Sequence, residues 1–488
     1  MKKTFLAISA LAAVLFAGCT SSDELTTLES VKNADNTPTP VQFGTYMGKS
    51  GTRSGLTGAI TDTQLKGTWD DDGDGGTTPE VPVGFGVFAY HTNTNTWATA
   101  GAETIPNFMY NQKVSWGTSV WEYTPLKFWP NDFSATQVDA NQPESEDVNA
   151  TGSQAGGKIS FYAYAPYVEL PTSPTTLTST GITAINGLGY AGGASGTPGT
   201  GNQKKGAPII SYTLNNDIQE SANVDLLWGL RGLASYNLAY GGTSAGTVGV
   251  DYNVDITKLK QGSGDVDKVN FEFHHALTKI CEFKVVADID GNSASPATAG
   301  LSPLPTTTQI LLTNVTIEDN AGNVFKSGDF NLSTGAWTNV TTAADFNYSY
   351  TNASAINTNV WEKADPAPSY SSGWSPIGVK ADELQNIFST NPSFFLIPDQ
   401  EQKLDITVSY TVRTYDPNLA AVGGVTCSKV DQTIKNTVTL PATVLNPHEK
   451  ITLVLHIGLT SVKFAATVDG WDNGGTEVVW LPSNVIEE

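Results

Sequence analysis

Cys19 has the most distinctive chemical surroundings in the chain, because it closes an apolar run near the start. Lys2 and Lys3 precede that run, and Gly18 is a small residue immediately before the cysteine. A basic start, a short apolar stretch and a small residue are typical of a secretory signal peptide. We therefore expect residues 1–18 to be removed and the thiol of Cys19 to carry lipid, since several acyl chains hold a protein at a membrane. The alternative is an ordinary signal peptide followed by an unmodified cysteine.

Arg53 and Ser54 mark a second place where another molecule could act on the chain. They lie in a run rich in glycine, serine and threonine, after a polar tether at residues 19–39 and a strand-like segment at residues 41–46. Proteases cut most readily in exposed segments of small and polar residues. We favour cleavage between Arg53 and Ser54 over the alternative that Arg53 is only a surface residue. Arg413 lies in an expected strand and should be protected from the same protease.

Two groups of residues look like metal sites but lack the full pattern. Asp70 to Gly75 opens like a calcium-binding loop, but the twelfth position is Val81 instead of the required glutamate. His274 and His275 have no third ligand at metal spacing nearby. We therefore expect a solvated acidic loop, structural histidines, and no metal or other cofactor.

Catalytic motifs are not recognisable. The sequence has no P-loop, and no cysteine and histidine form a pattern typical of nucleophilic catalysis. Trp97 and Trp374 could stack on sugars, although packing against loops is the better interpretation. Paired carboxylates of glycoside hydrolases can lie far apart in a sequence, so that class stays open. Our expectation is a protein that is not an enzyme.

The composition favours β-sheet with long polar loops and argues against nucleic acid as a partner. Only 15% of the residues are charged, and long helical runs of Ala, Leu, Glu and Lys are missing. A net charge of −22 leaves few cations to neutralise phosphates. Such a charge suits the exterior of an exported protein.

Cys281 and Cys427 are the other two cysteines, too few for a disulfide framework. Cys281 alternates with Phe283 and Val285, so we expect its side chain to face a core. A disulfide between Cys281 and Cys427 is one option, and two separate buried thiols is the interpretation that we favour.

Short apolar or alternating segments, separated by glycine and proline, recur along the chain. The clearest is residues 404–412, where every second residue is apolar, as in a half-buried strand. Turn residues at 262–265 favour a boundary near residue 260. The pattern predicts an all-β protein with one β-sandwich domain at residues 40–260 and a second at residues 261–488.

Several segments in order along the chain resemble the fimbrillin family, which comprises type V pilins and related surface lipoproteins of Bacteroidales. They are the lipidation motif, the early strand with its arginine, and the runs at residues 84–90, 116–130, 161–166, 225–228, 273–280 and 467–471. The resemblance implies two transthyretin-like β-sandwich domains in tandem. It also implies a structural subunit of a cell-surface pilus, or fimbrium, that serves in cell adhesion.

The resemblance further implies a route of assembly. A precursor with palmitate or another acyl chain on Cys19 would reach the cell surface at the outer membrane. An arginine-specific protease would remove the N-terminal strand after Arg53, and a donor strand from another pilin subunit would replace it by β-augmentation. The long loops expected at residues 139–157, 171–206 and 232–250 favour an adhesive tip that contacts a host glycan or protein.

The donor strand is expected at the C-terminal end, where Val478, Trp480 and Val485 are the candidates. The alternative there is an ordinary closing strand. A different function stays open for the whole chain, namely a stand-alone lipoprotein, anchored at the surface, that binds a glycan or a host protein.

Overall fold

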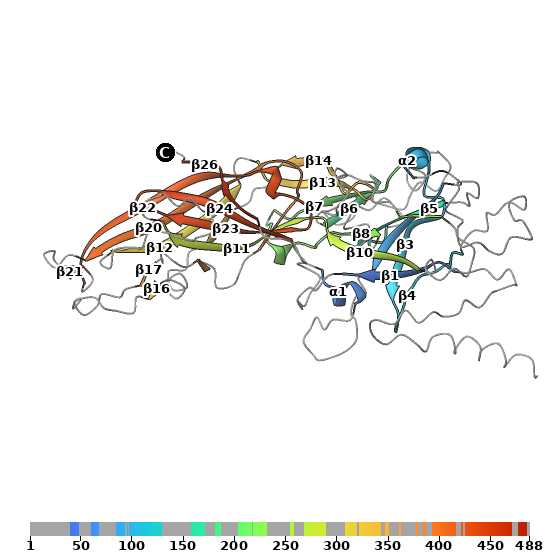
Figure 1. Cartoon of the computed structure of the whole chain (residues 1–488), viewed down its shortest axis with the longest axis horizontal. Coiled ribbons are helices and arrows are strands. Elements are labelled where there is room, and N and C mark those ends of the chain that lie inside the picture. Colours follow the sequence, from blue (N-terminus) through green and yellow to red (C-terminus); the bar gives the residue numbers. More distant parts are fainter. Residues whose placement is uncertain are drawn as a thin grey trace, which may run out of the picture.

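Strands form nearly all the regular structure, which confirms the all-β prediction. The computed structural model describes residues 40–47, 60–67, 84–92, 95, 97–128, 158–170, 181–186, 204–216, 218–231, 254–257, 268–288, 308–319, 322–342, 347–350, 361–362, 377–378, 384–386, 393–415, 421–422, 425–470 and 477–485. The arrangement is elongated, with the N-terminal strands at one end and the C-terminal strands at the other (Figure 1). No helix among these residues is long and apolar enough to cross a membrane.

The helices are short and lie between strands. They are α1 (Asp62–Lys66), α2 (Trp97–Ala100) and the 3-10 turns η1 (Gly101–Glu103), η3 (Glu220–Ala222) and η4 (Ala442–Val444).

The first sheet is apolar on both faces. Its order is β1-β10-β8-β5-β2-β3-β4, with β9 paired to β5. The strands are β1 (Gln42–Tyr46), β2 (Phe85–His91), β3 (Met109–Trp116), β4 (Trp121–Glu122), β5 (Lys158–Ala165), β8 (Leu227–Arg231), β9 (Val254–Thr257) and β10 (Lys268–His275). In β2, Phe85 and Val87 join one apolar cluster, while Phe88 and Tyr90 join another. A strand buried on both faces reads as a continuous apolar run, which explains the sequence of β2.

A four-stranded sheet contributes to the second of these clusters. Its order is β14-β13-β7-β6, formed by β6 (Gly181–Ile185), β7 (Ile209–Thr213), β13 (Phe325–Asn331) and β14 (Trp337–Thr342). Trp228 of β8 connects the two sheets, because its ring packs against Phe330 and its Nε1–H donates to the Leu332 carbonyl at 2.9 Å.

Two six-stranded sheets form the C-terminal end. One has the order β18-β11-β23-β24-β25 with β19 on β11, and the other has the order β15-β12-β20-β22-β21 with β26 on β22. The strands are β11 (Thr278–Ala287), β12 (Thr308–Asp319), β15 (Asn347–Tyr350), β18 (Gln385–Asn386), β19 (Phe394–Leu396), β20 (Gln402–Tyr415), β21 (Ala421–Val422), β22 (Val425–Leu440), β23 (Glu449–Ile457), β24 (Val462–Gly470), β25 (Glu477–Leu481) and β26 (Ser483–Val485). A separate pair joins β16 (Trp361–Glu362) to β17 (Ile377–Gly378).

The predicted alternation at residues 404–412 is present in β20. Leu404, Ile406, Val408 and Tyr410 are buried in a cluster to which β11, β23 and β24 also contribute. The two six-stranded sheets therefore share one core.

Hydrogen-bonded sheets join strands from both sides of residue 260. β10 pairs with β1 and β8, and β13 pairs with β7. The periodicity of a strand indicates its buried face but not its partner, so these pairings could not be predicted from the sequence. The expected domains at residues 40–260 and 261–488 stay a prediction.

Cys281 was expected to face a core, and it does not. The register of β11 against β23 shifts between Ile280 and Glu282, and Cys281 is the extra residue at this bulge. Its half-buried thiol donates to the Ile451 carbonyl at 3.4 Å, and burial raises its pKa. Cys281 is a free cysteine, which excludes the disulfide with Cys427.

Candidate strand-exchange site

β1 lies between two parts of the chain. On one side it pairs in parallel with β10, from Gln42 opposite Lys268 to Tyr46 opposite Glu272. On the other side, the Val41 N–H donates to the Lys127 carbonyl at 2.8 Å. The main chain of β1 is therefore bonded to β10 and to the residues that follow β4.

Aromatic side chains surround the apolar face of β1. Phe43 is 5% exposed, and its ring centroid lies 5.4 to 6.2 Å from the rings of four residues, Phe85, Tyr123, Phe161 and Phe271. Val41 and Met47 are also buried, as expected for alternate residues of one strand. Burying a side chain like that of Phe43 contributes about 1.5–3 kcal/mol. The β1-binding surface is the name that we give to these four aromatic residues, the edge of β10 that pairs with β1, and residues 121–128.

Two side-chain donors of the β1-binding surface hold β1 in register. The Trp121 Nε1–H donates to Thr45 Oγ1 at 3.0 Å, and the Tyr123 hydroxyl donates to the Val41 carbonyl at 2.8 Å. Burial raises the pKa of Tyr123, and the hydrogen bond that its oxygen accepts from the Lys127 N–H opposes that shift. The phenol is therefore a donor at neutral pH.

This arrangement binds an extended strand. Removal of β1 would leave the edge of β10 without its partner strand and would break the bonds from Trp121 and Tyr123 to β1 and its neighbour Val41, beside exposed aromatic rings. An unpaired strand edge next to apolar surface is a template for another strand. A strand with apolar residues at alternate positions would restore both kinds of contact.

The C-terminal candidates lie in strands of this same chain. Val478 and Trp480 belong to β25, which pairs with β24, and Val485 belongs to β26, which pairs with β22. These strands lie at the opposite end of the molecule from β1 (Figure 1).

The predicted sites of lipidation and processing, Cys19, Arg53 and Ser54, lie outside the described residues. In the sequence, Arg53 and Ser54 belong to residues 48–59, which connect Met47 to Ile60. The other two arginines, Arg231 and Arg413, lie in the hydrogen-bonded strands β8 and β20.

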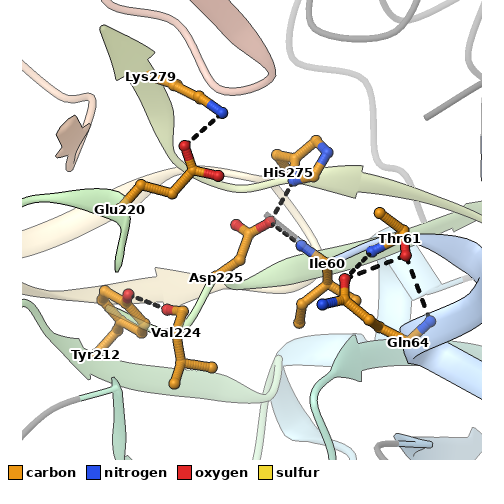
Figure 2. A network of polar contacts seen from close by, with 9 residues as sticks. All are labelled: Ile60, Thr61, Gln64, Tyr212, Glu220, Val224, Asp225, His275 and Lys279. Atoms are coloured by element: carbon orange, nitrogen blue, oxygen red, sulfur yellow. Dashed lines mark hydrogen bonds and ion pairs between the residues drawn. The ribbon is translucent and has the colours of Figure 1, made fainter. Parts of the chain in front are cut away.

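A polar network around Ile60 was not predicted from the sequence (Figure 2). The Ile60 N–H donates to Asp225 Oδ2 at 3.1 Å, and His275 Nδ1 lies 2.5 Å from the same oxygen. Thr61 and Gln64 form a capping box at the start of α1. The Thr-x-x-Gln pattern could have revealed the capping box, but no local pattern connects Ile60 with Asp225, 165 residues away.

Comparisons with known proteins show what this chain is similar to. No protein-family profile matches the chain. Fimbrium subunit Fim1C of Phocaeicola vulgatus is 23% identical to it over 411 residues, which cover 81% of this chain and 83% of that protein. This chain is therefore similar to a fimbrium subunit over most of its length.

Solved structures similar to this chain include two fimbrial proteins. A fimbrial protein from Bacteroides vulgatus has a TM-score of 0.49 and 20% identity, covering 89% of this chain and 99% of that one. A fimbrial assembly protein from Parabacteroides distasonis has a TM-score of 0.29 and 10% identity, covering 90% and 99%.

A polar pocket of about 580 Å³ lies beside the segment that holds β1. Its wall includes Tyr110, Lys113, Glu122, Tyr123, Tyr167 and Glu169. The Lys113 ammonium group lies 5.3 Å from the centre of the Tyr167 ring. Burial raises the pKa of Tyr110 to about 12, so this phenol is neutral. Aromatic rings beside carboxylates and an ammonium group suit a sugar more than an apolar ligand.

The two histidines that resembled a partial metal site are buried. His274 and His275 contact His448, with ring centroids 4.5 and 6.2 Å apart. Among the described residues, no group of three or more metal-binding side chains is arranged to hold an ion.

Proposed function

We propose that this protein is a fimbrillin-like structural subunit of a cell-surface fimbrium, assembled by donor-strand exchange after cleavage behind Arg53. The observation that carries the proposal is β1 itself. It is a five-residue edge strand in an aromatic surface, and the segment that joins it to the rest of the chain contains Arg53.

The positions of the other two arginines support this proposal. Arg231 pairs with Phe271 across β8 and β10, and Arg413 pairs with Lys429 across β20 and β22. Hydrogen-bonded strands must open before a protease can bind them. Cleavage at arginine would therefore act on residues 48–59 and leave the sheets whole.

The placement of the C-terminal strands supports exchange between subunits. Val478, Trp480 and Val485 belong to β25 and β26. These strands lie at the opposite end of the molecule from β1 (Figure 1), so a C-terminal donor would fill the β1-binding surface of a neighbouring subunit. We infer that each end of the molecule carries a transthyretin-like β-sandwich domain.

Export as a lipoprotein completes the proposal. Acyl chains on Cys19 would hold the precursor at the outer membrane until cleavage releases it from residues 19–53. An adhesive tip is the position that the long predicted loops would suit, and a host glycan or protein is the partner expected there. Residues 139–157 and 232–250 lie outside the described residues, and residues 171–206 are not one continuous loop, because β6 (Gly181–Ile185) lies within them.

Mass spectrometry of protein shed from the native cell surface tests the processing step. We expect a mature chain that begins at Ser54. A chain that begins only at acylated Cys19 would contradict it.

A matched pair of variants tests the assembly step. R53Q should leave the precursor monomeric, whereas R413Q should not block processing. Purified protein that begins at Ser54 should form ladders that resist mild denaturant, because each inserted strand buries aromatic surface. Persistent monomers under those conditions would count against strand exchange.

The polar pocket favours a second candidate function, the binding of a glycan by a surface-anchored lipoprotein. Tyr167 and its neighbours offer ring faces and charged groups to a sugar. A glycan array probed with the full chain and with a Tyr167→Ala variant tests this function. Binding that is lost in the variant would support it, and equal binding by both proteins would contradict it.

A further inference from the structure

Asp225 connects residues 60–67 to the body of the protein. Its side chain is fully buried and comes just before β8. One carboxylate oxygen accepts the Ile60 N–H at 3.1 Å and lies 2.5 Å from His275 Nδ1 in β10 (Figure 2). Hydrogen bonds to a charged group are stronger than neutral ones, and losing one inside a protein leaves a buried group without its partner.

Further contacts attach the same residues to other parts of the fold. The Gly84 N–H donates to the Leu65 carbonyl at 3.0 Å, and Leu65 is fully buried. The Lys66 ammonium group lies 4.9 Å from the centre of the Trp116 ring. These partners belong to β3 and to the residues before β2 and β8, and His275 of β10 contacts residues 60–67 only through Asp225. None of these partners belongs to β1.

Residues 60–67 also share a core with β1. Ile60 and Leu65 lie in the same apolar cluster as Phe43 and Phe271. If residues 60–67 detached from the fold together with β1, the apolar side chains of Ile60 and Leu65 would no longer pack beside the β1-binding surface. If they stay, an incoming strand meets a surface that is already ordered, which lowers the entropic cost of binding.

We propose that Asp225 and His275 form an anchor that keeps residues 60–67 folded onto the body after cleavage at Arg53, so that the strand before the cut is released alone. The inference rests on the proposed processing, and the anchor limits how much of the chain detaches from the fold when β1 is released. With the anchor in place, β1 can dissociate from the cut chain while residues 60–67 stay packed in the core. The β1-binding surface is then ordered when a donor strand binds.

Hydrogen exchange measured by mass spectrometry tests the anchor directly, because the Ile60 N–H is one of the exchanging groups. The full chain is compared before and after treatment with an arginine-specific protease. We expect peptides covering residues 60–67 to keep their protection within about twofold after the cut. Peptides covering residues 41–47 should disappear from the cut protein in mild denaturant. Loss of protection at residues 60–67 on cutting would overturn the anchor.

A pair of variants assigns the protection to Asp225. D225N keeps the shape of the side chain but replaces a charged acceptor by a neutral one. Exchange at residues 60–67 should become about tenfold faster or more, because roughly that factor separates charged from neutral hydrogen bonds. E220Q is the matched control. Glu220 is also buried and lies in η3, between β7 and β8 in the sequence, but its carboxylate pairs with Lys279 at 2.6 Å (Figure 2). Equal exchange at residues 60–67 in D225N and E220Q would overturn the assignment.

Two further arms keep the test decisive. Peptides from β20 and β22 report whether each variant is folded, and H275N replaces D225N if that variant fails to fold. If the protease does not cut at Arg53, the proposed processing fails, while the comparison of uncut variants still decides whether Asp225 holds residues 60–67.

Discussion

His448 is held neutral by its surroundings. Its backbone has a φ of 69°, and its ring lies 4.5 Å from that of His274 and 6.2 Å from that of His275. Burial and then the two neighbouring histidines lower the pKa of His448 from 6.5 to about 2. The nearby carboxylates already face other groups, since Glu272 lies 3.4 Å from His274 and Asp225 contacts His275.

A pH dependence of stability follows from His448. Its folded pKa lies below its unfolded value, so below about pH 6.5 the unfolded chain takes up a proton that the folded protein does not. This residue therefore lowers the free energy of unfolding by up to about 1.4 kcal/mol per pH unit as the pH falls. Urea unfolding at pH 7.5 and pH 5.0 should show a smaller loss in H448N than in the wild type. Asparagine tolerates the positive φ, so H448N keeps the backbone. An unchanged pH slope in H448N would assign the dependence elsewhere.

Gly335 is required by a close contact. Its φ is 68°, and a Cβ built there would lie 2.1 Å from the Trp228 ring. Gly322 has a φ of 81° but open space, with its nearest contact at 4.0 Å. G322A should cost about 1–2 kcal/mol for the left-handed backbone, and G335A about 1–3 kcal/mol more for overpacking. Urea unfolding midpoints check this difference, and equal losses would mean that Trp228 moves without cost.

At the scale of elements, β1 provides the next test. Phe43 points into the aromatic surface, whereas Gln42 is exposed on the same strand. F43A should weaken the binding of β1 to the β1-binding surface by about 3 kcal/mol, as truncation of a buried aromatic side chain does in general. Q42A should change it by less than about 0.5 kcal/mol. The measurement is the rate at which the cut strand leaves the body, followed by size-exclusion chromatography. Similar rates for both variants would show that main-chain pairing alone retains β1.

Elements were predicted well where they are local. The strand expected at residues 41–46 is β1, and the alternation of β20 was evident because its two faces differ. Partners across the chain were not predictable. The parallel pairing of β1 with β10 depends on main-chain groups that every residue carries, and the contact between Asp225 and Ile60 joins two segments that look ordinary alone. The bulge at Cys281 was missed because one extra residue reverses an alternation without changing composition.

At the scale of the whole molecule, charge opposes assembly. With a net charge of −22, two copies of the chain repel each other. The Debye length falls from about 30 Å at 0.01 M salt to about 8 Å at 0.15 M, so salt should speed the polymerisation of chains that begin at Ser54. Light scattering across this range checks the expectation. A rate that falls with salt would instead indicate that attraction between opposite charges guides the subunits.

The long strands of the C-terminal end also have a mechanical meaning. β20 and β22 are matched over 14 residue pairs, from Gln402 opposite Leu440 to Tyr415 opposite Cys427. They run mostly along the long axis of the molecule (Figure 1). A force that stretches the molecule along that axis loads these pairs together, in shear, and does not peel them apart one at a time. The same ladder that closes a hydrophobic core thus makes this end of the subunit a stiff link under tension.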